Sequence, residues 1–545
     1  MSARLQLPVV LASIAVALAT LLFRLAAFNG FENDHFMHVA WSQQLLFGDW
    51  PGRDFVEPGM PLAVALSALG QLAWPGFFSE AVLGIAMVSA AAGFTCATAA
   101  SMTRSIPAGL AAGLLVAASY PRLYSYPKLL VPAVALWLVA RYVRSHSRRG
   151  LWALAAWAVV AFLLRHDLGL MTAAALGVAL AVDPSPGLGA RAAAIARFVG
   201  MGVLLVSPYL LYVQVTEGLA EHVRVGLEFG KAEQHQVLWG MLSLTPEEGG
   251  LAIAIGGWRL SPEALLLWMY SAVTVGLTVV LVCWRRAPAL PTAAALWIFV
   301  LGFRLVILRH PLRARLPDVA VVAAVAGVIV AAEVLRRLPA WWRTRPAWSF
   351  GAAVTLLTLA LVTGLSLWSV VNLSDRLAQA GVRRGASGVV AAARDVVRRG
   401  RARSWDPYWP AGDVPPIVDY LTRCTRPGDR LLLTWFAPEY YLFAGRPFAA
   451  GQSQFFRQSF ATDRDQALML ARMERQTVPF VLINEANQAE FTRAFPRLAA
   501  FLAESYTVRA RFPRDDEDTT IAVGVRNDLH PRTTFKAPPW VCGYD

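Results

Sequence analysis

Long apolar stretches recur along the first two thirds of the chain, separated by short polar segments. A membrane-crossing helix needs roughly 20 apolar residues, so this pattern predicts about eleven transmembrane helices. The expected spans are residues 6–28, 78–100, 106–120, 127–143, 150–165, 167–182, 193–215, 263–285, 291–309, 317–336 and 348–371. We expect the apolar segment 61–74 to be a short surface or re-entrant helix, because a further span there would invert every later loop.

The pattern changes after residue 371, where turn-rich polar sequence carries short apolar runs. The predicted elements there are strands at 431–435 and 480–483, a helix at 487–505, and strands at 506–512 and 519–525. Strands that alternate with helices are typical of a small α/β domain. We therefore expect a polytopic α-helical membrane protein with a transmembrane domain over 1–371 and an α/β domain over 372–545.

Composition and charge narrow the class of protein. Of 545 residues, 56% are hydrophobic and 16% are charged, which is unusual for a soluble or a disordered chain. The formal net charge of +14 raises the possibility of a nucleic-acid partner. Much of the basic charge, however, lies between apolar segments, where it orients helices in a membrane. We expect no nucleic-acid partner.

The basic loops also predict an orientation. They span residues 141–149, 285–286 and 336–345. Placing all three on the cytoplasmic side puts the N-terminus inside, and the loops 29–77 and 216–262 and the C-terminal domain outside. This arrangement indicates a multi-pass protein of a bacterial inner (plasma) membrane with a periplasmic C-terminal domain. Cys424 and Cys542 lie in that outer domain and could form a disulfide there.

Two outer segments contain basic residues that the orientation rule does not explain. Arg122 and Lys128 lie in the first segment, and Arg309, Arg313 and Arg315 lie in the second. Such side chains can extend to the phosphates of bulk lipid. They can also bind one specific phosphate-bearing lipid, because arginine makes bidentate contacts to phosphate. Because both basic segments are expected on the outer face, we favour a specific binding site for a phosphate-bearing lipid.

A third polar feature, Arg165-His166-Asp167, separates two short apolar runs at the outer face. Three such residues are costly if they face lipid, so they are expected to line a cavity. The alternative is an Arg165–Asp167 pair that only shapes the turn between two helices.

The first outer loop holds the candidate acids. Asn33 or Asp34 can cap a helix over about 35–47, which we expect to be amphipathic and to lie along the membrane surface. Asp34 would then be held at the bilayer boundary, where a general base for a lipid-linked substrate is needed. Simple helix capping is an equally good explanation of this residue.

Metal binding is a weaker alternative for this loop. His35 and His38 are three residues apart and share a helix face, so they are possible metal ligands. Glu57, which precedes Pro58, is another candidate acid or metal ligand. The two histidines can also be ordinary polar residues at the protein surface.

Together these segments resemble the GT-C superfamily of membrane glycosyltransferases. The likeness is greatest to bacterial relatives of protein O-mannosyltransferases and of the lipid A aminoarabinose transferase. The resemblance is carried by the outer acid and helix (33–47), the stretch 48–62, the junction 165–169, Pro427-Gly428-Asp429-Arg430 and Gly445-Arg446-Pro447. Each motif is loose, and their order and sidedness are the stronger signal.

The resemblance implies a polyprenyl-phosphate-linked sugar as donor and an acceptor hydroxyl that the first-loop acid deprotonates. Asp34 matches that acid, although many relatives have two adjacent acids there. Glu57 resembles a second acidic position that binds the acceptor or a divalent metal in some members. No other cofactor is implied. The remaining acceptor-side candidates are Asp54, His35, Arg165, His166 and Asp167.

The physical chemistry of these residues fits that reaction. Arg122, Lys128, Arg309, Arg313 and Arg315 would neutralise the charge that develops on the leaving phosphate. Asp34 would act as the general base, and direct displacement would invert the anomeric centre. The acceptor can be a lipid, a glycan or a protein.

Three other functions compete with this one. A transporter or flippase would explain the many spans, but it predicts ionisable residues at mid-membrane and paired broken helices, which the sequence does not clearly contain. A glycan ligase would use the same lipid carriers. A membrane scaffold would not depend on Asp34 or Arg309.

Overall fold

The computed structural model divides the chain into two compact units. The residues it describes are 3–31, 33–57, 59–232, 253–255, 258–283, 289–309, 313–344, 346–402, 414–455, 460–513, 520–535 and 540–544. Unit 1 consists of Met1–Phe28, Ala81–Pro208 and Gln234–Arg398. Unit 2 consists of Asn29–Glu80, Tyr209–Glu233 and Arg399–Asp545. Each unit is therefore assembled from segments that are far apart in the sequence.

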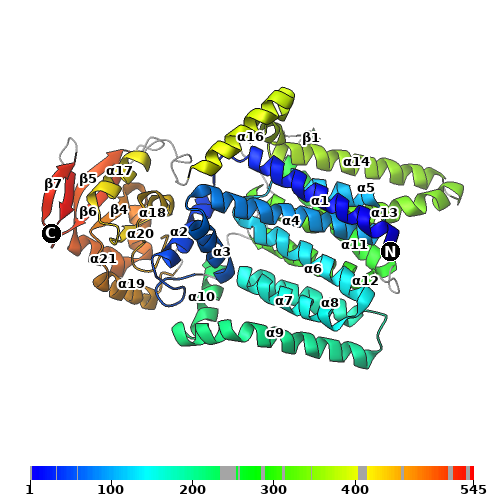
Figure 1. Cartoon of the computed structure of the whole chain (residues 1–545), viewed down its shortest axis with the longest axis horizontal. Helices are drawn as coiled ribbons and strands as arrows, with labels where there is room; N and C mark the ends of the chain where they lie inside the picture. The colour runs from blue at the N-terminus through cyan, green and yellow to red at the C-terminus, as the bar shows by residue number, and fades with distance from the viewer. Residues whose placement is uncertain are drawn as a thin grey trace. The chain divides into compact units, whose positions relative to one another are not determined.

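Unit 1 is built mainly from long helices, which Figure 1 shows side by side. Its α-helices are α1 (Ala3–Ala26), α4 (Phe77–Thr103), α5 (Ile106–Ala118), α6 (Tyr126–Ser145), α7 (Arg148–Leu164), α8 (His166–Val182), α9 (Leu188–Thr216), α11 (Pro262–Cys283), α12 (Leu290–Arg309), α13 (Ala320–Thr344), α14 (Pro346–Val370), α15 (Leu373–Gln379) and α16 (Gly385–Arg401). Its short elements are η1 (Leu123–Ser125), η2 (Arg313–Val319), η3 (Val382–Arg384), β1 (Ile253–Ile255) and β2 (Trp258–Leu260).

Small residues let these helices approach closely. A Cβ atom added to Gly109 of α5 would lie 2.6 Å from the Cβ of Ala100 on α4. One added to Gly169 of α8 would lie 2.2 Å from the Cα of Phe162 on α7. Close backbone approach of this kind is how helices pack where the surroundings are apolar. The apolar sequence therefore specifies the helices, and its glycines specify where they meet.

The polytopic helical fold class is confirmed, but the count of eleven spans is not. Within the described ranges, eight helices are long and apolar enough to cross a membrane, and each coincides with an expected span. The other three expected spans are also helices, but α5 has 13 residues and α7 and α8 have 17 each. The segment expected to form a short helix is α3 (Pro61–Ala73), which has 13 residues.

Unit 2 contains the α/β region expected at the C-terminal end. Its helices are α2 (Asn33–Leu46), α3, α10 (Leu219–Ala232), α17 (Val414–Cys424), α18 (Glu439–Ala444), α19 (Asp463–Arg475), η5 (Glu485–Asn487), α20 (Gln488–Ala494) and α21 (Pro496–Ser505). Its strands are β3 (Leu431–Leu433), β4 (Phe480–Asn484), β5 (Tyr506–Pro513), β6 (Thr520–Arg526), β7 (Pro531–Phe535) and β8 (Trp540–Tyr544).

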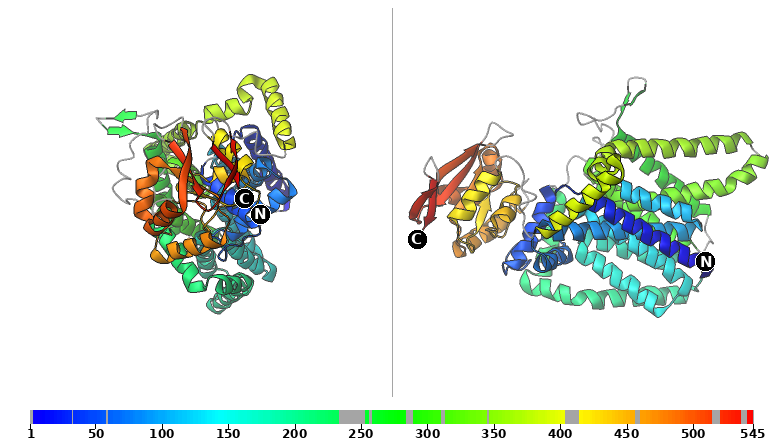
Figure 2. Two further views of the ribbon diagram at one scale, coloured as in Figure 1. Left: turned by 90° about the vertical axis from the view of Figure 1, so that its left-hand side faces the viewer. Right: turned by 45° about the horizontal axis from the view of Figure 1, so that its top comes forward.

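The main sheet has the strand order β3-β4-β6-β5. Figure 2 shows strands of the C-terminal region as orange and red arrows. Strands β3 and β4 are parallel, with Leu431 opposite Phe480, and β6 is antiparallel to both β4 and β5. The hairpin β7–β8 is separate from this sheet. A disulfide joins Cys424 at the end of α17 to Cys542 of β8, across 118 positions of sequence.

Alternate strand residues build two cores, one on each face of the sheet. Leu431, Leu433 and Leu482 belong to a core that includes α17 and α18. Leu432 and Val481 belong to the other, which includes α19 and α21. The first of these cores also contains residues from the first loop (29–77), among them Met37, Trp41 and Phe55. The C-terminal region therefore shares its interior with a segment almost 400 positions earlier in the chain.

The expected amphipathic character of the helix over 35–47 is wrong. The polar side chains of Ser42 and Gln44 are as buried in α2 as the apolar side chains of Val39 and Ala40. Gln44 satisfies its amide by bonding the backbone of Phe448, accepting from the N–H at 3.0 Å and donating to the carbonyl at 3.2 Å. Because protein groups replace water around both faces, α2 is an interior helix of unit 2.

Candidate functional site

Several predicted basic residues meet at one end of the helices of unit 1. Lys128, near the start of α6, forms an ion pair with Asp318 of η2, and both side chains are buried. Lys128 also interacts electrostatically with Arg165 and Arg315. The structure thus brings three of the predicted cations together, and Asp318 is a carboxylate that the sequence pattern did not single out.

Arg313 is engaged by the end of α14. Its guanidinium donates to the carbonyl oxygen of Val370 at 3.0 Å and of Ser369 at 3.3 Å, which are among the last carbonyls of that helix. It also forms an ion pair with Glu263 of α11 at 3.3 Å. A cation at a helix C-terminus satisfies unpaired carbonyls and the helix dipole. Arg313 therefore holds α11, α14 and η2 together.

Two further arginines join this end of the unit without having been predicted. Arg24 of α1 and Arg376 of α15 both contact the ring of Tyr120, with their guanidinium carbons 3.7 and 4.4 Å from the ring centroid. Arg24 also donates to the carbonyl of Pro121 at 2.7 Å. Arg122, which was predicted, donates to the Tyr124 hydroxyl at 3.0 Å. Arg24 escaped notice because it lies within an expected span.

Arg165 and Asp167 form the pair that was the alternative prediction for their motif. Two parallel hydrogen bonds of 2.8 and 2.7 Å join the guanidinium to the carboxylate at the junction between α7 and α8. His166 stacks on Phe162, with ring centroids 4.2 Å apart. The side chain of Arg309, the last residue of α12, lies outside the described part of the structure.

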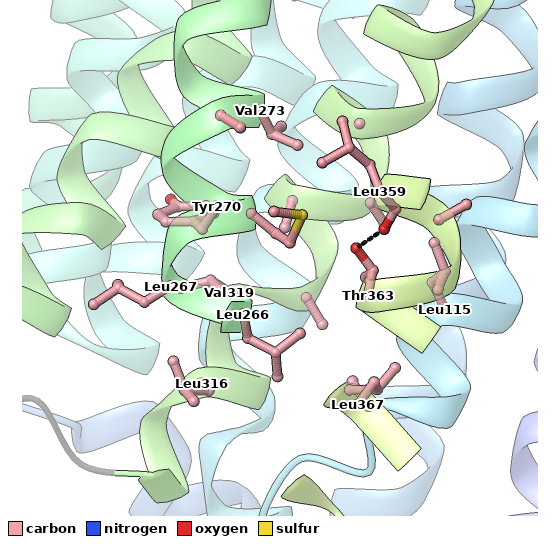
Figure 3. Close-up of a pocket in the computed structure, with 18 of the residues that line it drawn as sticks. Leu115, Leu266, Leu267, Tyr270, Val273, Leu316, Val319, Leu359, Thr363 and Leu367 are labelled. Carbon is pink, nitrogen blue, oxygen red and sulfur yellow. Dashed lines mark hydrogen bonds between the residues drawn. The ribbon is translucent and has the colours of Figure 1, made fainter. Parts of the chain in front are cut away.

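Unit 1 also contains an apolar cavity of about 380 Å³ (Figure 3). It is lined by residues of α5, α11, α12, α13, α14 and η2, among them Leu115, Leu266 and Leu367. Two of its lining residues, Pro317 and Val319, flank Asp318, and a third is Val370, whose carbonyl binds Arg313. The cavity and the basic cluster therefore occupy the same end of unit 1.

Asp34 lies in the first turn of α2 and is half-buried. The neighbouring His35 is buried, and its Nε2 lies 2.7 Å from a carboxylate oxygen of Glu80. The second Glu80 oxygen accepts a hydrogen bond of 2.5 Å from Ser67. This interior polar network fixes His35 in place next to Asp34. Glu80 was overlooked because it lies in the predicted span 78–100.

Among the described acids of unit 2, Glu57 has the largest pKa shift. It is buried, it accepts a hydrogen bond from the backbone N–H of Met60, and burial raises its pKa to about 7. His222 and Glu217 interact with it electrostatically, and they form a pair of their own at 2.6 Å. Tyr209 lies 3.5 Å from the other ring nitrogen of His222. This acid–base cluster includes two residues of the predicted loop 216–262 that the sequence pattern did not identify.

The metal-ligand candidates do not come together. The ring of His38 stacks on Trp41 at 5.5 Å, while the carboxylate of Glu57 binds backbone N–H groups. In the part of the chain that is described, no group of three or more His, Cys, Asp or Glu side chains could hold a metal ion. The donor set present does not fit a metal site, so no chemical step is assigned to one.

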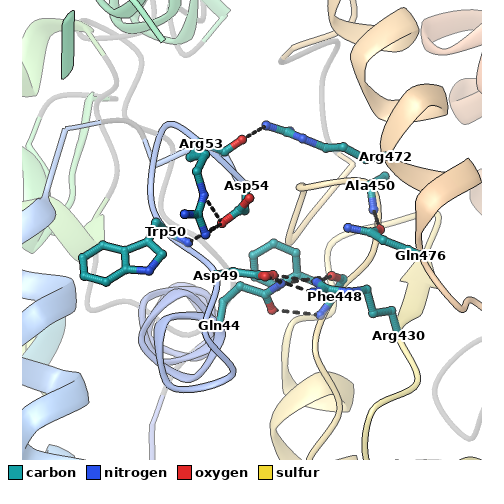
Figure 4. Close-up of polar contacts among 10 residues, drawn as sticks. All are labelled: Gln44, Asp49, Trp50, Arg53, Asp54, Arg430, Phe448, Ala450, Arg472 and Gln476. Carbon is teal, nitrogen blue, oxygen red and sulfur yellow. Dashed lines mark hydrogen bonds and ion pairs between the residues drawn. The ribbon is translucent and has the colours of Figure 1, made fainter. Parts of the chain in front are cut away.

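Asp54 shapes the loop that precedes Glu57. Its carboxylate accepts hydrogen bonds from the Arg53 guanidinium at 2.6 Å and from the backbone N–H of Trp50 at 2.9 Å (Figure 4). The same figure shows Asp49 facing Arg430, with which it forms an ion pair of 2.6 Å. These contacts give the loop a defined conformation and hold the Asp54 carboxylate in it.

Comparisons with known proteins give a distant likeness among solved structures. No protein-family model and no curated protein matches the chain. Among solved structures, the matches include the crystal structure of ArnT from Cupriavidus metallidurans in the apo state. It is 15% identical, with a TM-score of 0.45, over 94% of this chain and 97% of that one. A match with so low an identity and TM-score does not by itself establish an activity.

Proposed function

We propose that this protein is a membrane glycosyltransferase of the GT-C type that transfers a sugar from a polyprenyl-phosphate-linked donor to an acceptor hydroxyl. The observation that carries the proposal is the apolar cavity of unit 1 beside a cluster of cations. A lipid-linked sugar combines an apolar chain with an anionic phosphate, so it matches both parts at once. A water-soluble sugar nucleotide would need no apolar cavity of this kind.

The cations of this end have different parts in the proposed reaction. Lys128 and Arg313 are already paired with Asp318 and Glu263, so they hold the helix ends in place and contribute to the local field. Arg122, which also donates to the Tyr124 hydroxyl, and Arg315 are half-buried, so part of each guanidinium is accessible for direct contact with a lipid phosphate. Such fixed charges stabilise a leaving phosphate because they need no reorganisation during the reaction.

Asp34 is proposed as the general base on the acceptor hydroxyl, and displacement by that hydroxyl inverts the anomeric centre. Its place in the first turn of a buried helix holds the carboxylate on a rigid element. Glu57 is proposed to orient the acceptor from its loop. The Glu57 carboxyl group titrates near neutral pH, since its pKa is about 7.

The test uses the full-length protein in proteoliposomes with a panel of radiolabelled polyprenyl-phosphate sugars and a membrane extract as acceptor. We expect wild-type protein to form a covalent glycoconjugate, and Asp34→Asn to lower the rate by about 10²- to 10⁴-fold. Asp375→Asn, at an exposed acid of α15, is the matched control and should leave the rate unchanged. A folded Asp34→Asn protein with full activity would disprove the assignment, and transport of the donor without a covalent product would favour a flippase.

A further inference from the structure

The first loop is tied to the C-terminal α/β region by a bidentate ion pair (Figure 4). The two outer nitrogens of the Arg430 guanidinium donate to the two carboxylate oxygens of Asp49 at 2.6 and 2.9 Å. Gln44 donates to the same carboxylate at 2.5 Å. The partners are 381 positions apart in the sequence, and their side chains are only 18% and 14% exposed. A pair with this geometry orients both of its partners.

Arg430 is itself held on rigid backbone. It directly precedes β3, and its own N–H bonds the carbonyl of Thr477 at 2.8 Å. Its guanidinium also donates to the carbonyl of Phe448 at 3.1 Å, and Leu431 and Phe448 form a backbone bridge. The sheet therefore determines where the guanidinium lies, and the guanidinium determines where Asp49 lies.

Further hydrogen bonds join the C-terminal region to the loop that leads to Glu57. The N–H of Val56 donates to the carbonyl of Gly451 at 3.0 Å, and Arg472 of α19 donates to the carbonyl of Arg53 at 3.2 Å. Gly451 has a φ of +73°, and a Cβ atom there would lie 2.7 Å from the carbonyl oxygen of Asp54. The backbones of the loop and of the C-terminal region thus fit together without room for a side chain.

These ties connect the two acids of the proposed reaction. Asp34 is near the start of α2, and Asp49 follows the end of that helix. Glu57 follows Val56 directly, on the far side of the same loop. Because Met37 and Trp41 of α2 are part of the core of the C-terminal region, the helix cannot shift without that region. The region is therefore placed to set the positions of both acids.

We propose that Arg430 is a positioning residue for the transfer reaction, and that the C-terminal α/β region serves to hold Asp34 and Glu57 in their reactive arrangement. This inference rests on the proposed function, since it presumes that these two acids act on the acceptor. Arg430 touches neither acid, and it acts through Asp49 and the loop. Small displacements of reacting groups are costly, because a shift of about 1 Å can lower a rate about 10²-fold.

The test compares Arg430→Gln with Arg423→Gln in full-length protein. Arg423 is the matched control, since it forms an exposed pair with Asp419 on α17 of the same unit. We expect Arg430→Gln to lower kcat by about 10- to 100-fold, with the KM for the lipid donor within about twofold of wild type. The control should keep both constants. Arg430→Lys keeps the positive charge but cannot make the bidentate contact. Its kcat should lie between those of Arg430→Gln and Arg423→Gln.

Two further readouts separate positioning from folding. Loosening the loop exposes Glu57, so in Arg430→Gln the acidic limb of the kcat–pH profile should move to lower pH. The exchanged pair Asp49→Arg with Arg430→Asp should recover at least about a third of the lost kcat. The inference would be overturned if Arg430→Gln only lowered the amount of active protein, left the acidic limb of the kcat–pH profile unmoved, and regained no kcat in the exchanged pair. Unchanged kcat in a folded Arg430→Gln protein would also overturn it.

Failure of the proposed function is distinguishable from failure of this inference. If wild-type protein forms no covalent glycoconjugate, the proposed function fails whatever Arg430 does. Hydrogen exchange over residues 33–57 then still tests the tie itself: faster exchange in Arg430→Gln than in Arg423→Gln supports it, and equal exchange overturns it.

Discussion

Glu57 is a buried carboxyl group beside an ion pair, His222–Glu217, and its ionisation is expected to govern the pH response of unit 2. Desolvation penalises the charged form and raises the pKa to about 7, from an ordinary value of 4.5. The folded state therefore binds this proton more tightly than the unfolded state does. Stability contributed by the protonated form is present at low pH and is lost as the pH rises from about 4.5 to 7.

We expect the wild-type protein to lose about 3 kcal/mol of unfolding free energy across that window through this one group. Glu57→Gln removes the titration, so its melting temperature should fall less between pH 5 and pH 8. Glu474→Gln, at an exposed position of α19, should follow the wild type. Differential scanning fluorimetry at several pH values measures the difference, and parallel curves for the wild type and Glu57→Gln would contradict the prediction.

Lys128 and Asp318 illustrate how a buried pair constrains single substitutions. Both are buried, and they come from positions 190 residues apart. Removing one partner leaves the other charge buried without compensation, which typically lowers the free energy of unfolding by about 3–5 kcal/mol. Asp318→Asn should therefore lower the melting temperature strongly in detergent.

The double variant Lys128→Met with Asp318→Leu removes both charges, and it should recover most of that stability. Transfer activity in the stable double variant then decides whether Lys128 contributes to donor binding. A KM for the donor equal to that of wild type would exclude such a role, whereas a raised KM with a recovered melting temperature would support it.

At the scale of elements, the cavity depends on five helices and η2 keeping their separation. Ala323, on α13, is one of its lining residues, while Val354 of α14 is exposed and does not line it. An exposed position on an apolar helix tolerates a larger side chain, but a side chain that enters the cavity excludes a ligand chain.

Ala323→Phe is therefore expected to raise the KM for a long-chain polyprenyl donor by about 10-fold or more, at a loss of roughly 1–2 kcal/mol of binding for displaced apolar contacts. Val354→Phe should not change it. With a short-chain donor analogue that does not fill the cavity, the KM values of the two variants should differ less. Equal KM values for the long-chain donor in both variants would show that the cavity does not bind the chain.

At the scale of the whole molecule, the proposal depends on sidedness. The predicted orientation places residues near the first loop and residues after the last span on the same side of the membrane. Trp50 and Asn372 are both exposed, and Ser185 is exposed in the connection between α8 and α9, which is predicted to be cytoplasmic.

Single cysteines at these positions, in a Cys283→Ser background, provide the measurement. In intact right-side-out cells or spheroplasts, a membrane-impermeant thiol reagent should label Trp50→Cys and Asn372→Cys, and it should label Ser185→Cys only after permeabilisation. Labelling of positions 50 and 372 from opposite sides would contradict the orientation and, with it, the enzyme proposal.

The sequence was sufficient for the parts of this protein that follow from local rules. Each helix closes its own hydrogen bonds, so an apolar run of sufficient length predicts a span without knowledge of its neighbours. The α/β character of the C-terminal region followed in the same way from its alternating short elements. The resemblance of ordered motifs suggested the class of reaction and the candidate acid, Asp34.

Only the tertiary structure decided which of these residues meet. The burial of Ser42 and Gln44 depends on the backbone of Phe448, about 400 positions away, which no local pattern reports. The pairs Lys128–Asp318 and Arg430–Asp49 likewise join distant segments. A charge on a predicted face looks the same in the sequence whether it contacts lipid, substrate or another side chain. Tertiary packing decides between these cases, because a buried charge is stable only when the fold places a partner beside it.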